Sequence, residues 1–234
     1  MRIAMVSEHA SPLATPGGPD AGGQNVYVAR LTEELTRRGH DVTVYTRRDS
    51  PEAPHRVELP GGAVVEHVPA GPPEPLPKDE LFPSMPAFGT YLARAWDEEP
   101  PDVAHAHFWM SGMAAQLGAY AHGIPVVQTF HALGTVKRRH QGKRDTSPYE
   151  RVGVERRIGR SCGRVLATCT DEVYELATWA CRRARCPWCP AVSTWITSIP
   201  APTPATLPRE RNADGSWRAA GSSRARGTSR RSVR

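Results

Sequence analysis

Cysteine is scarce in the first 176 residues of the chain, where only Cys162 and Cys169 occur. Two cysteines are too few for a disulfide framework, so a cytoplasmic protein with reduced thiols is expected. The sequence also lacks a run of about 18 apolar residues, the length that a membrane-spanning helix requires. Its opening, MRIAMVSEHASP, has too short an apolar run for a signal peptide. These absences predict no transmembrane segment and leave peripheral contact with a membrane open.

Charge is divided unevenly along the chain. Residues 177–234 contain eleven Arg, no Lys, and only Glu210 and Asp214 as acids, which gives this tail a net charge of +9. The whole chain carries +6, so residues 1–176 carry −3. Four of the six Trp and three of the five Cys also lie in the tail. Its Pro-, Ser- and Arg-rich composition predicts that residues 177–234 are disordered.

Residues 1–176 alternate short apolar runs with amphipathic segments. Strands are expected over residues 2–7, 41–46, 64–68, 102–107, 125–131 and 164–169. Helices are expected over 24–38, 87–98, 111–123 and 151–161, with another opening at Asp171 and a loop over the basic segment 137–144. This pattern predicts an α/β fold, a Rossmann-like parallel sheet with helices on both faces, followed by an irregular tail. Ligands of such sheets bind at the carboxyl ends of the strands.

A glycine-rich segment, residues 17–25, lies between the first expected strand and the first expected helix. Glycine allows close backbone approach, and the N–H groups of a helix start can bind an anion such as a diphosphate. The segment is not the G-x-G-x-x-G of dinucleotide-binding folds, and the glycines alone do not separate phosphate binding from a flexible turn.

Three histidines fall at strand ends. His105 and His107 share one side of a strand, but no Asp, Glu or Cys cluster accompanies them at metal spacing, so no metal site is expected. His105 has the pattern of a core or strand-end histidine. His131 follows a strand and precedes the small residues Ala132 and Gly134, which favours a polar or catalytic role.

Two further groups of residues admit a functional interpretation. The basic run over residues 137–144 is typical of a solvated loop, and its alternative is a phosphate-binding loop. It has no interleaved aromatic residues, which argues against nucleic-acid binding. Cys181, Cys186 and Cys189 lack a fourth ligand at zinc spacing.

Four ordered motifs resemble retaining GT-B glycosyltransferases of family 4, within the branch of the mycothiol-type inositol-phosphate N-acetylglucosaminyltransferases and the sucrose synthases. They are SEHASPLATPGGPDAGGQNVYVARLTEELTRRGHDVTVYTRR, DVAHAHFWMSGMAA, PVVQTFHALGTVKRRH and SPYERVGVERRIGRSCGRVLATCTDEVYEL. The resemblance spans residues 1–176 and implies the acceptor-side, amino-terminal lobe. It implies a nucleotide-sugar co-substrate, a small acceptor, and neither a metal nor another cofactor.

The resemblance also implies roles for individual residues. Gly22, Gly23 and Asn25 resemble the loop that faces the donor diphosphate, and His131 resembles the catalytic histidine near the transferred sugar. His9, Lys78 and Arg151 resemble groups that surround the acceptor and its phosphate. Two positions depart from the inositol-phosphate enzyme: Phe108 replaces a Tyr and Ala132 replaces a Thr, which removes two hydroxyl contacts.

The tail reads differently when the frame is shifted one base upstream. Trp has a single codon, so the shifted reading is fixed after three of the tail tryptophans: Gly over Ala180, Val over Cys189 and Asp over Ile196. With free choice among the other codons, residues 179–198 can read MGVPxxxVSVVPCGVDLDxF, which resembles the family's interlobe segment. Residues 220–227 can read GRLVPRKG, which resembles the start of the donor-binding lobe. We therefore expect a one-base slip near residues 176–178, and a chain that is inactive alone.

The sequence leaves three alternative functions open. The first is transfer of a hexosyl group from a nucleotide sugar to a small acceptor in the full-length relative. The second is a noncatalytic module that binds a phosphate or sugar ligand. The third is a nucleic-acid binder that uses the arginine-rich tail.

Overall fold

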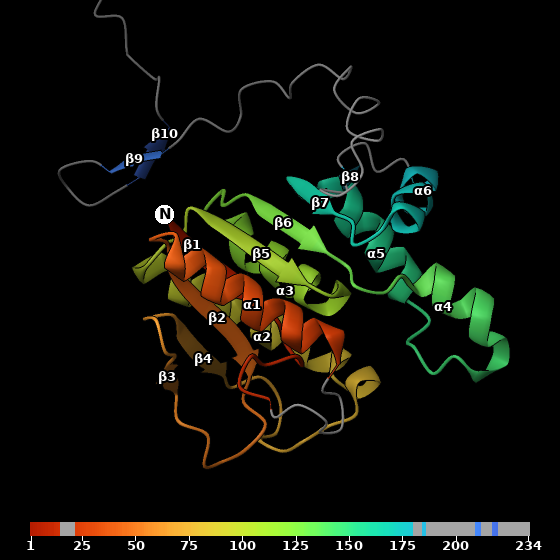
Figure 1. Ribbon diagram of the computed structural model, residues 1–234, viewed down its shortest axis with the longest axis horizontal. Coiled ribbons are helices and arrows are strands. Elements are labelled where there is room, and N and C mark those ends of the chain that lie inside the picture. The colour runs from red at the N-terminus through yellow and green to blue at the C-terminus, as the bar shows by residue number, and fades with distance from the viewer. Residues whose placement is uncertain (15–21, 180–183, 186–208, 212–216, 220–234) are drawn as a thin grey trace, which may run out of the picture. The chain divides into compact units, whose positions relative to one another are not determined.

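The computed structural model describes residues 1–14, 22–179, 184–185, 209–211 and 217–219 (Figure 1). The chain divides into two units, Met1–Ser198 and Ile199–Arg234. In the second unit, strand β9 (Arg209–Arg211) pairs antiparallel with β10 (Trp217–Ala219). The first unit contains the sheet and helices that follow.

The first unit is built on a mainly parallel sheet whose order is β3-β4-β2-β1-β5-β6-β7-β8. Only the edge strand β3 runs antiparallel to its neighbour. The order reverses at β1, which lies between β2 and β5, and such a reversal opens a crevice at the carboxyl ends of the strands. The strands are β1 (Arg2–Val6), β2 (Asp41–Arg47), β3 (Arg56–Glu58), β4 (Val64–Val68), β5 (Val103–His107), β6 (Val126–Thr129), β7 (Arg164–Leu166) and β8 (Ala184–Arg185).

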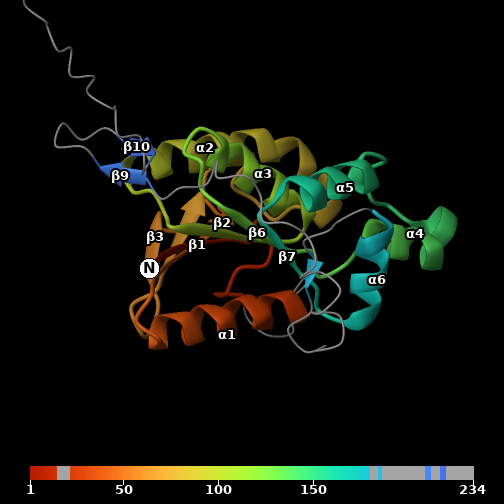
Figure 2. The ribbon, with the colours of Figure 1, turned by 90° about the horizontal axis from the view of Figure 1, so that it is seen from above.

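Helices cover both faces of this sheet. Ile3 and Met5 of β1 pack in a cluster with Val28 of helix α1 (Gly23–Arg37), because alternate side chains of a strand point to opposite faces. Ala4 and Val6 belong to the larger cluster formed with helices α2 (Met85–Glu98) and α3 (Trp109–Tyr120). Figure 2 shows α1 on one side of the sheet and α2 and α3 on the other. The predicted Rossmann-like α/β architecture is confirmed.

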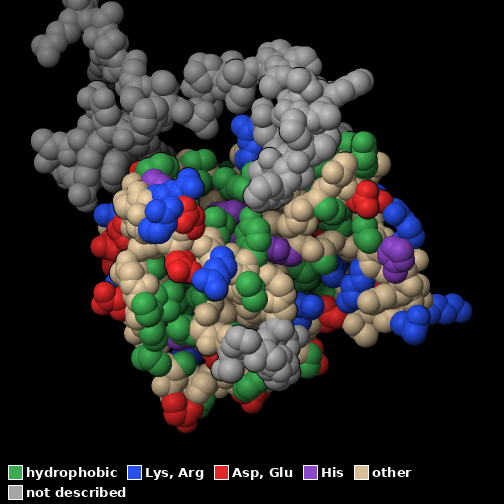
Figure 3. All heavy atoms as spheres, in the orientation of Figure 1, with side chains coloured by type: hydrophobic (Ala, Val, Ile, Leu, Met, Phe, Trp, Pro, Cys, Tyr) green, Lys and Arg blue, Asp and Glu red, His purple; other side chains and the backbone are tan. Residues whose placement is uncertain are grey.

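The remaining helices are α4 (Gly134–Gln141), α5 (Arg151–Ser161) and α6 (Thr170–Thr178), with 3-10 turns η1 (Lys78–Glu80), η2 (Phe82–Ser84) and η3 (Gly142–Arg144). The prediction of a loop over residues 137–144 is therefore wrong, because α4 and η3 cover this segment. This segment contains no proline, and Val136 packs against the core, which anchors one side of α4. Its basic side chains lie at the surface, where Figure 3 shows Lys and Arg on the projecting end of the molecule.

Helix α3 also begins at Trp109, two residues before the predicted start. Strand β8 pairs with β7 beyond residue 176, the predicted end of the ordered part, and α6 ends at Thr178. Most of the tail predicted to be disordered, with Cys181, Cys186 and Cys189, lies outside the described residues. In the portion that the structure describes, no helix has the length and apolar character to cross a membrane.

Candidate functional site

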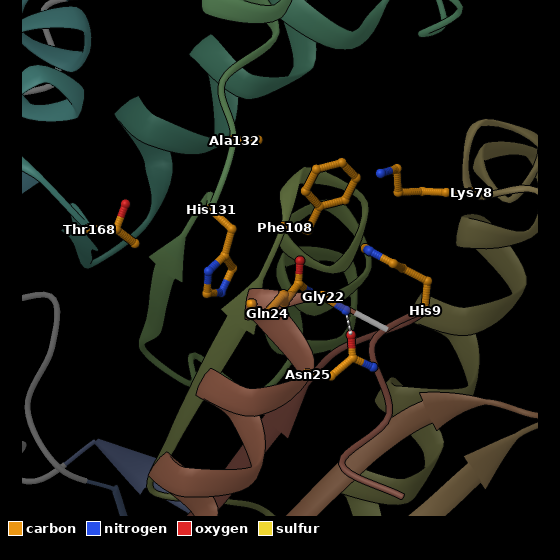
Figure 4. Close-up of a pocket in the computed structure, with 10 residues that line it drawn as sticks. His9, Gly22, Gln24, Asn25, Lys78, Phe108, His131, Ala132 and Thr168 are labelled. Carbon is orange, nitrogen blue, oxygen red and sulfur yellow. Dashed lines mark hydrogen bonds between the residues drawn. The ribbon is translucent and has the colours of Figure 1, made fainter. Parts of the chain in front are cut away.

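A cavity of about 370 Å³ opens at the carboxyl ends of β1, β5, β6 and β7. Figure 4 shows His131 and Thr168 on one side of it and His9 and Lys78 on the other, with Phe108 between. Six of the predicted site residues line it, and they come from four separate segments: His9, Gly22, Gly23, Asn25, Lys78 and His131. Gln24, Phe108, Ala132 and Thr168 complete the wall. Arg151, the seventh predicted residue, is not in the lining.

The start of helix α1 forms one wall of this cavity. Gly22 is the N-cap residue, and its N–H donates to the Asn25 side-chain oxygen at 3.1 Å. A Cβ added at Gly22 or Gly23 would meet no atom within 4 Å, and Gly22 has a φ of −129°, which any residue can adopt. The glycines therefore keep space open in front of the helix rather than satisfy a strained backbone. The first N–H groups of the helix lack intrahelical partners and carry the positive end of its dipole.

The side chains that follow the glycines fix this wall in place. Asn25 donates to the Ser11 carbonyl at 3.1 Å, which links α1 to the loop after β1. Gln24 donates to the Ser7 hydroxyl at 3.3 Å and to the His107 carbonyl at 3.4 Å. The helix start is thereby attached to the ends of both β1 and β5.

His131 lies just after β6 in a left-handed backbone conformation, with a φ of 61°. Its Nε2 is 3.0 Å from Nδ1 of His107, and the Tyr27 ring meets it edge-on with centroids 5.1 Å apart. Burial, together with the neighbouring His9, lowers the pKa of His131 to about 4. At neutral pH, His131 therefore faces the cavity as an uncharged imidazole.

His105 and His107 lie behind His131. The two rings are 4.1 Å apart, and Nε2 of His105 is 2.9 Å from the Thr129 hydroxyl. Burial lowers the pKa of His105 to about 3 and holds the pKa of His107 well below its usual value. Nε2 of His107 is buried without a hydrogen-bond partner. No group of three metal-ligating side chains forms within the described residues.

Phe108 caps helix α3 with φ 77° and ψ 162°, a region that glycine almost alone occupies. Hydrogen bonds hold this backbone: its N–H donates to the Thr129 carbonyl at 2.8 Å, and its carbonyl accepts from Gln128 at 2.9 Å. Three basic side chains surround the ring. The Arg151 guanidinium lies 4.9 Å and the Lys78 ammonium 5.6 Å from its centroid, and the His9 ring meets it edge-on at 5.0 Å.

Arg151 is buried behind the cavity wall, with 1% of its surface exposed. Its Nε donates to Glu155 at 2.8 Å, one terminal nitrogen donates to the Ser147 hydroxyl at 3.1 Å, and the other to the Ala132 carbonyl at 2.8 Å. Glu155 in turn accepts the Gly134 N–H at 2.9 Å. Burial raises the pKa of Glu155, against the opposing effect of Arg151. The pair holds the backbone from residue 132 to 134, directly after His131.

A larger cavity of about 1180 Å³ shares His9, Asn25 and Lys78 with the first. Lys137 of the basic run lines it but is paired with Asp145 at 3.2 Å and Asp79 at 3.5 Å. The sequence left open that this run is a phosphate-binding loop. In the structure, Lys137 instead forms ion pairs, and its pair with Asp79 links α4 to η1.

The family model described as Glycosyltransferase Family 4 matches residues 21–190. The chain belongs to glycosyltransferase family 4. A D-inositol 3-phosphate glycosyltransferase of Streptomyces scabiei is 39% identical over 179 residues, which cover 75% of this chain and 40% of the relative. Another, from Stackebrandtia nassauensis, is 42% identical over 175 residues, or 73% of this chain and 40% of the relative. The chain thus spans about two fifths of the length of these relatives.

Solved structures place this family 4 chain among the GT-B glycosyltransferases. Sucrose-phosphate synthase from Thermosynechococcus elongatus superposes with a TM-score of 0.74 at 28% identity, covering 79% of this chain and 47% of the synthase. HepE of Anabaena, solved in complex with UDP and glucose, has a TM-score of 0.52 at 12% identity, covering 80% of this chain and 43% of HepE, and shows the shared fold alone.

The sequence analysis did not predict several residues at this cavity. Gln24 and Thr168 line the wall, and Glu8 contacts His9 from behind. A signal for Thr168 was available, because it lies two residues after a strand end, as His131 does. Glu8 lies at the same position after β1, but its burial could not be foreseen, since an acidic residue beside a strand is ordinarily exposed.

Proposed function

We propose that this chain forms the acceptor-side half of a retaining glycosyltransferase that moves a hexosyl group from a nucleotide sugar to a small hydroxylated acceptor. One observation carries the proposal: four distant segments bring an open helix start, a neutral histidine and a lysine to one cavity at the strand ends. We also propose that the enzyme works in the cytoplasm, without a metal or other cofactor.

The donor diphosphate would lie against Gly22, Gly23 and Asn25. An anion at a helix start is stabilised by free N–H groups and by the helix dipole. The open space in front of both glycines supports this placement, because a diphosphate oxygen has to approach the backbone closely.

His131 would contact the transferred sugar. Its uncharged ring can accept or donate a hydrogen bond to a sugar hydroxyl without repelling a positively charged sugar in the transition state. The left-handed backbone at this residue costs conformational energy, and such costs concentrate at functional sites.

The acceptor would lie between His9 and Lys78, where the two cavities meet. Within the described residues, no carboxylate pairs with Lys78, which leaves its ammonium group free for an anionic or hydroxylated ligand. Arg151 would act indirectly on the acceptor, because its nitrogens are engaged by Glu155, Ser147 and the Ala132 carbonyl.

We propose that residues 177–234 lack the cations with which the family binds the donor. The charge division and the shifted reading of the tail support a frame slip near residues 176–178. Residues 1–176 without a lobe to hold the nucleotide would bind a nucleotide sugar weakly and would not turn it over.

The test begins with sequencing the gene across codons 170–185. The 234-residue chain and a frame-restored version are then assayed against a panel of nucleotide sugars. We expect turnover only after restoration. Full activity of the 234-residue chain would refute the frame slip, and ligand binding without turnover by both would favour the noncatalytic module. Salt-dependent DNA binding that disappears when residues 177–234 are deleted would favour the nucleic-acid binder.

A further inference from the structure

Glu8 is a carboxylate buried directly behind the cavity wall. Its side chain has 0% exposure, and both oxygens are engaged: one accepts the Ser111 hydroxyl, and the other lies 2.7 Å from Nδ1 of His9. The backbone on either side is also held, because the Glu8 N–H donates to the Ser111 oxygen at 3.0 Å and its carbonyl accepts the Arg47 N–H at 3.1 Å.

Burying this carboxylate has a cost that packing alone does not explain. A buried charge loses several kcal/mol of solvation unless it is well paired. Within the described residues, no Lys or Arg forms an ion pair with Glu8, and His9 is the one basic side chain that contacts it. An apolar residue at this position would avoid the cost but would make neither of the two side-chain contacts of the carboxylate, those with Ser111 and His9.

The contact fixes which nitrogen of His9 carries the proton. An ionised carboxylate only accepts hydrogen bonds, so Nδ1 of His9 has to donate. In the neutral ring, Nε2 then keeps its lone pair. Figure 4 shows the His9 ring directed toward the cavity interior, and within the described residues Nε2 has no hydrogen-bond partner. The cavity thereby receives an acceptor atom of fixed identity, on the side where the Lys78 ammonium, a donor, also lies.

We propose that Glu8 is a positioning residue that holds His9 in the Nδ1–H tautomer, so that Nε2 accepts a hydrogen bond from the hydroxyl of an alcohol acceptor. A hydroxyl can donate to His9 and accept from Lys78 at once, which neither a carboxylate nor an ammonium group can do. The inference rests on the proposed function for the identity of the ligand. The tautomer itself does not depend on it.

The direct test is the tautomer of His9 in the ¹⁵N-labelled 234-residue chain, read from two-bond ¹H–¹⁵N couplings at a pH where the ring is neutral. His9→Gln assigns the signals. We expect the Nδ1–H form in the wild type. Finding mainly the Nε2–H form would overturn the proposal, whatever the chain does with sugars.

Two variants at the same contact separate a positioning role from a structural one. In Glu8→Gln, the Ser111 hydroxyl has no other described acceptor and donates to the amide oxygen, so the amide N–H₂ faces His9 and shifts it toward the Nε2–H form. Ser111→Ala disturbs the same packing but keeps the carboxylate, and should leave the tautomer unchanged. Equal effects of the two variants, or none from Glu8→Gln, would contradict the proposal. Glu33→Gln on the exposed face of α1 is the control for loss of a charge.

Turnover in the frame-restored protein gives a second measurement. Glu8→Gln should raise the KM of the acceptor about tenfold, the effect of one lost hydrogen bond, and leave the KM of the donor unchanged. An equal rise in both KM values would contradict an acceptor-specific role. Absence of turnover in the restored wild type would count against the proposed function only, because the tautomer measurement decides the role of Glu8.

Discussion

Nδ1 of His107 lies 3.0 Å from Nε2 of His131, which links a buried strand residue to the histidine that faces the cavity. Burial keeps both rings neutral, so one ring donates to the other without a formal charge. His131 is attached to β6 through a left-handed backbone, and its side chain is attached to β5 through this bond. The orientation of the imidazole is therefore set by two neighbouring strands.

The first prediction concerns this pair in the frame-restored protein. His131→Ala should lower kcat about tenfold or more and change the donor KM less, because its proposed contact is with the reacting sugar. His107→Phe should lower kcat as well, and the double variant should be no worse than His131→Ala, since His107 acts through His131. Steady-state kinetics of the three variants test this. His140→Ala, exposed on α4, is the control, and additive losses would contradict the coupling.

The second prediction separates the fold from ligand binding at the start of α1. Gly23→Ala adds a methyl group where no atom lies within 4 Å, so the free energy of unfolding should stay the same or rise by up to about 1 kcal/mol. The same methyl group occupies the space in front of the helix, and binding of inorganic diphosphate should weaken about tenfold. Calorimetry and backbone amide shifts measure both effects.

Gly153 of α5 is the matched control, since it is also helical and its Cβ would meet no atom within 4 Å. Gly153→Ala should give a similar change in stability and no change in diphosphate binding. Equal diphosphate affinities of Gly23→Ala and the wild type would show that the diphosphate does not bind at this position.

Sequence reasoning located residues at the cavity where their position depends on their own segment. Gly22 and Gly23 stand between a strand and a helix, and His131 stands at a strand end, and both positions can be read from local hydrophobic patterns. Lys78 lies in a proline-rich connection without such a pattern, and only the family resemblance selected it.

The rest depended on contacts between distant segments. Glu8 is buried because Ser111, 103 positions away, accepts and donates hydrogen bonds to it. The position of Arg151 beneath the wall depends on the Ala132 carbonyl, 19 positions away, which accepts a hydrogen bond from its guanidinium. The strained backbone of Phe108 is held by Gln128 and Thr129 of the neighbouring strand. None of these contacts leaves a periodic trace in the sequence.

The third prediction concerns the pH dependence of stability. The ordinary pKa of histidine is 6.5, whereas burial lowers that of His131 to about 4 and that of His105 to about 3. Above pH 6.5 these rings are neutral in both the folded and unfolded states. Between pH 6.5 and about 4 the unfolded chain binds protons that the folded chain excludes, so the free energy of unfolding should fall as the pH falls.

Urea denaturation at several pH values measures this slope. His105→Asn can keep a hydrogen bond to Thr129 but cannot titrate, so it should reduce the slope by up to about 1.4 kcal/mol per pH unit between pH 6 and 4. His140→Gln, on the surface of α4, is the control. A slope unchanged by His105→Asn would show that this ring is protonated in the folded state.

The fourth prediction concerns the buried pair of Arg151 and Glu155. Arg151→Met removes the cation and leaves Glu155 buried without its ion-pair partner, so the free energy of unfolding should fall by about 3–5 kcal/mol. The double variant Arg151→Met, Glu155→Gln removes both charges, and its amide oxygen can still accept the Gly134 N–H that Glu155 now accepts. It should recover most of the loss, because a pair of neutral residues carries no desolvation penalty.

Urea denaturation of the wild type, both single variants and the double variant gives the coupling free energy. If the double variant is as unstable as Arg151→Met, the loss comes from the contacts of Arg151 with Ser147 and the Ala132 carbonyl, and the buried charge of Glu155 is not its cause.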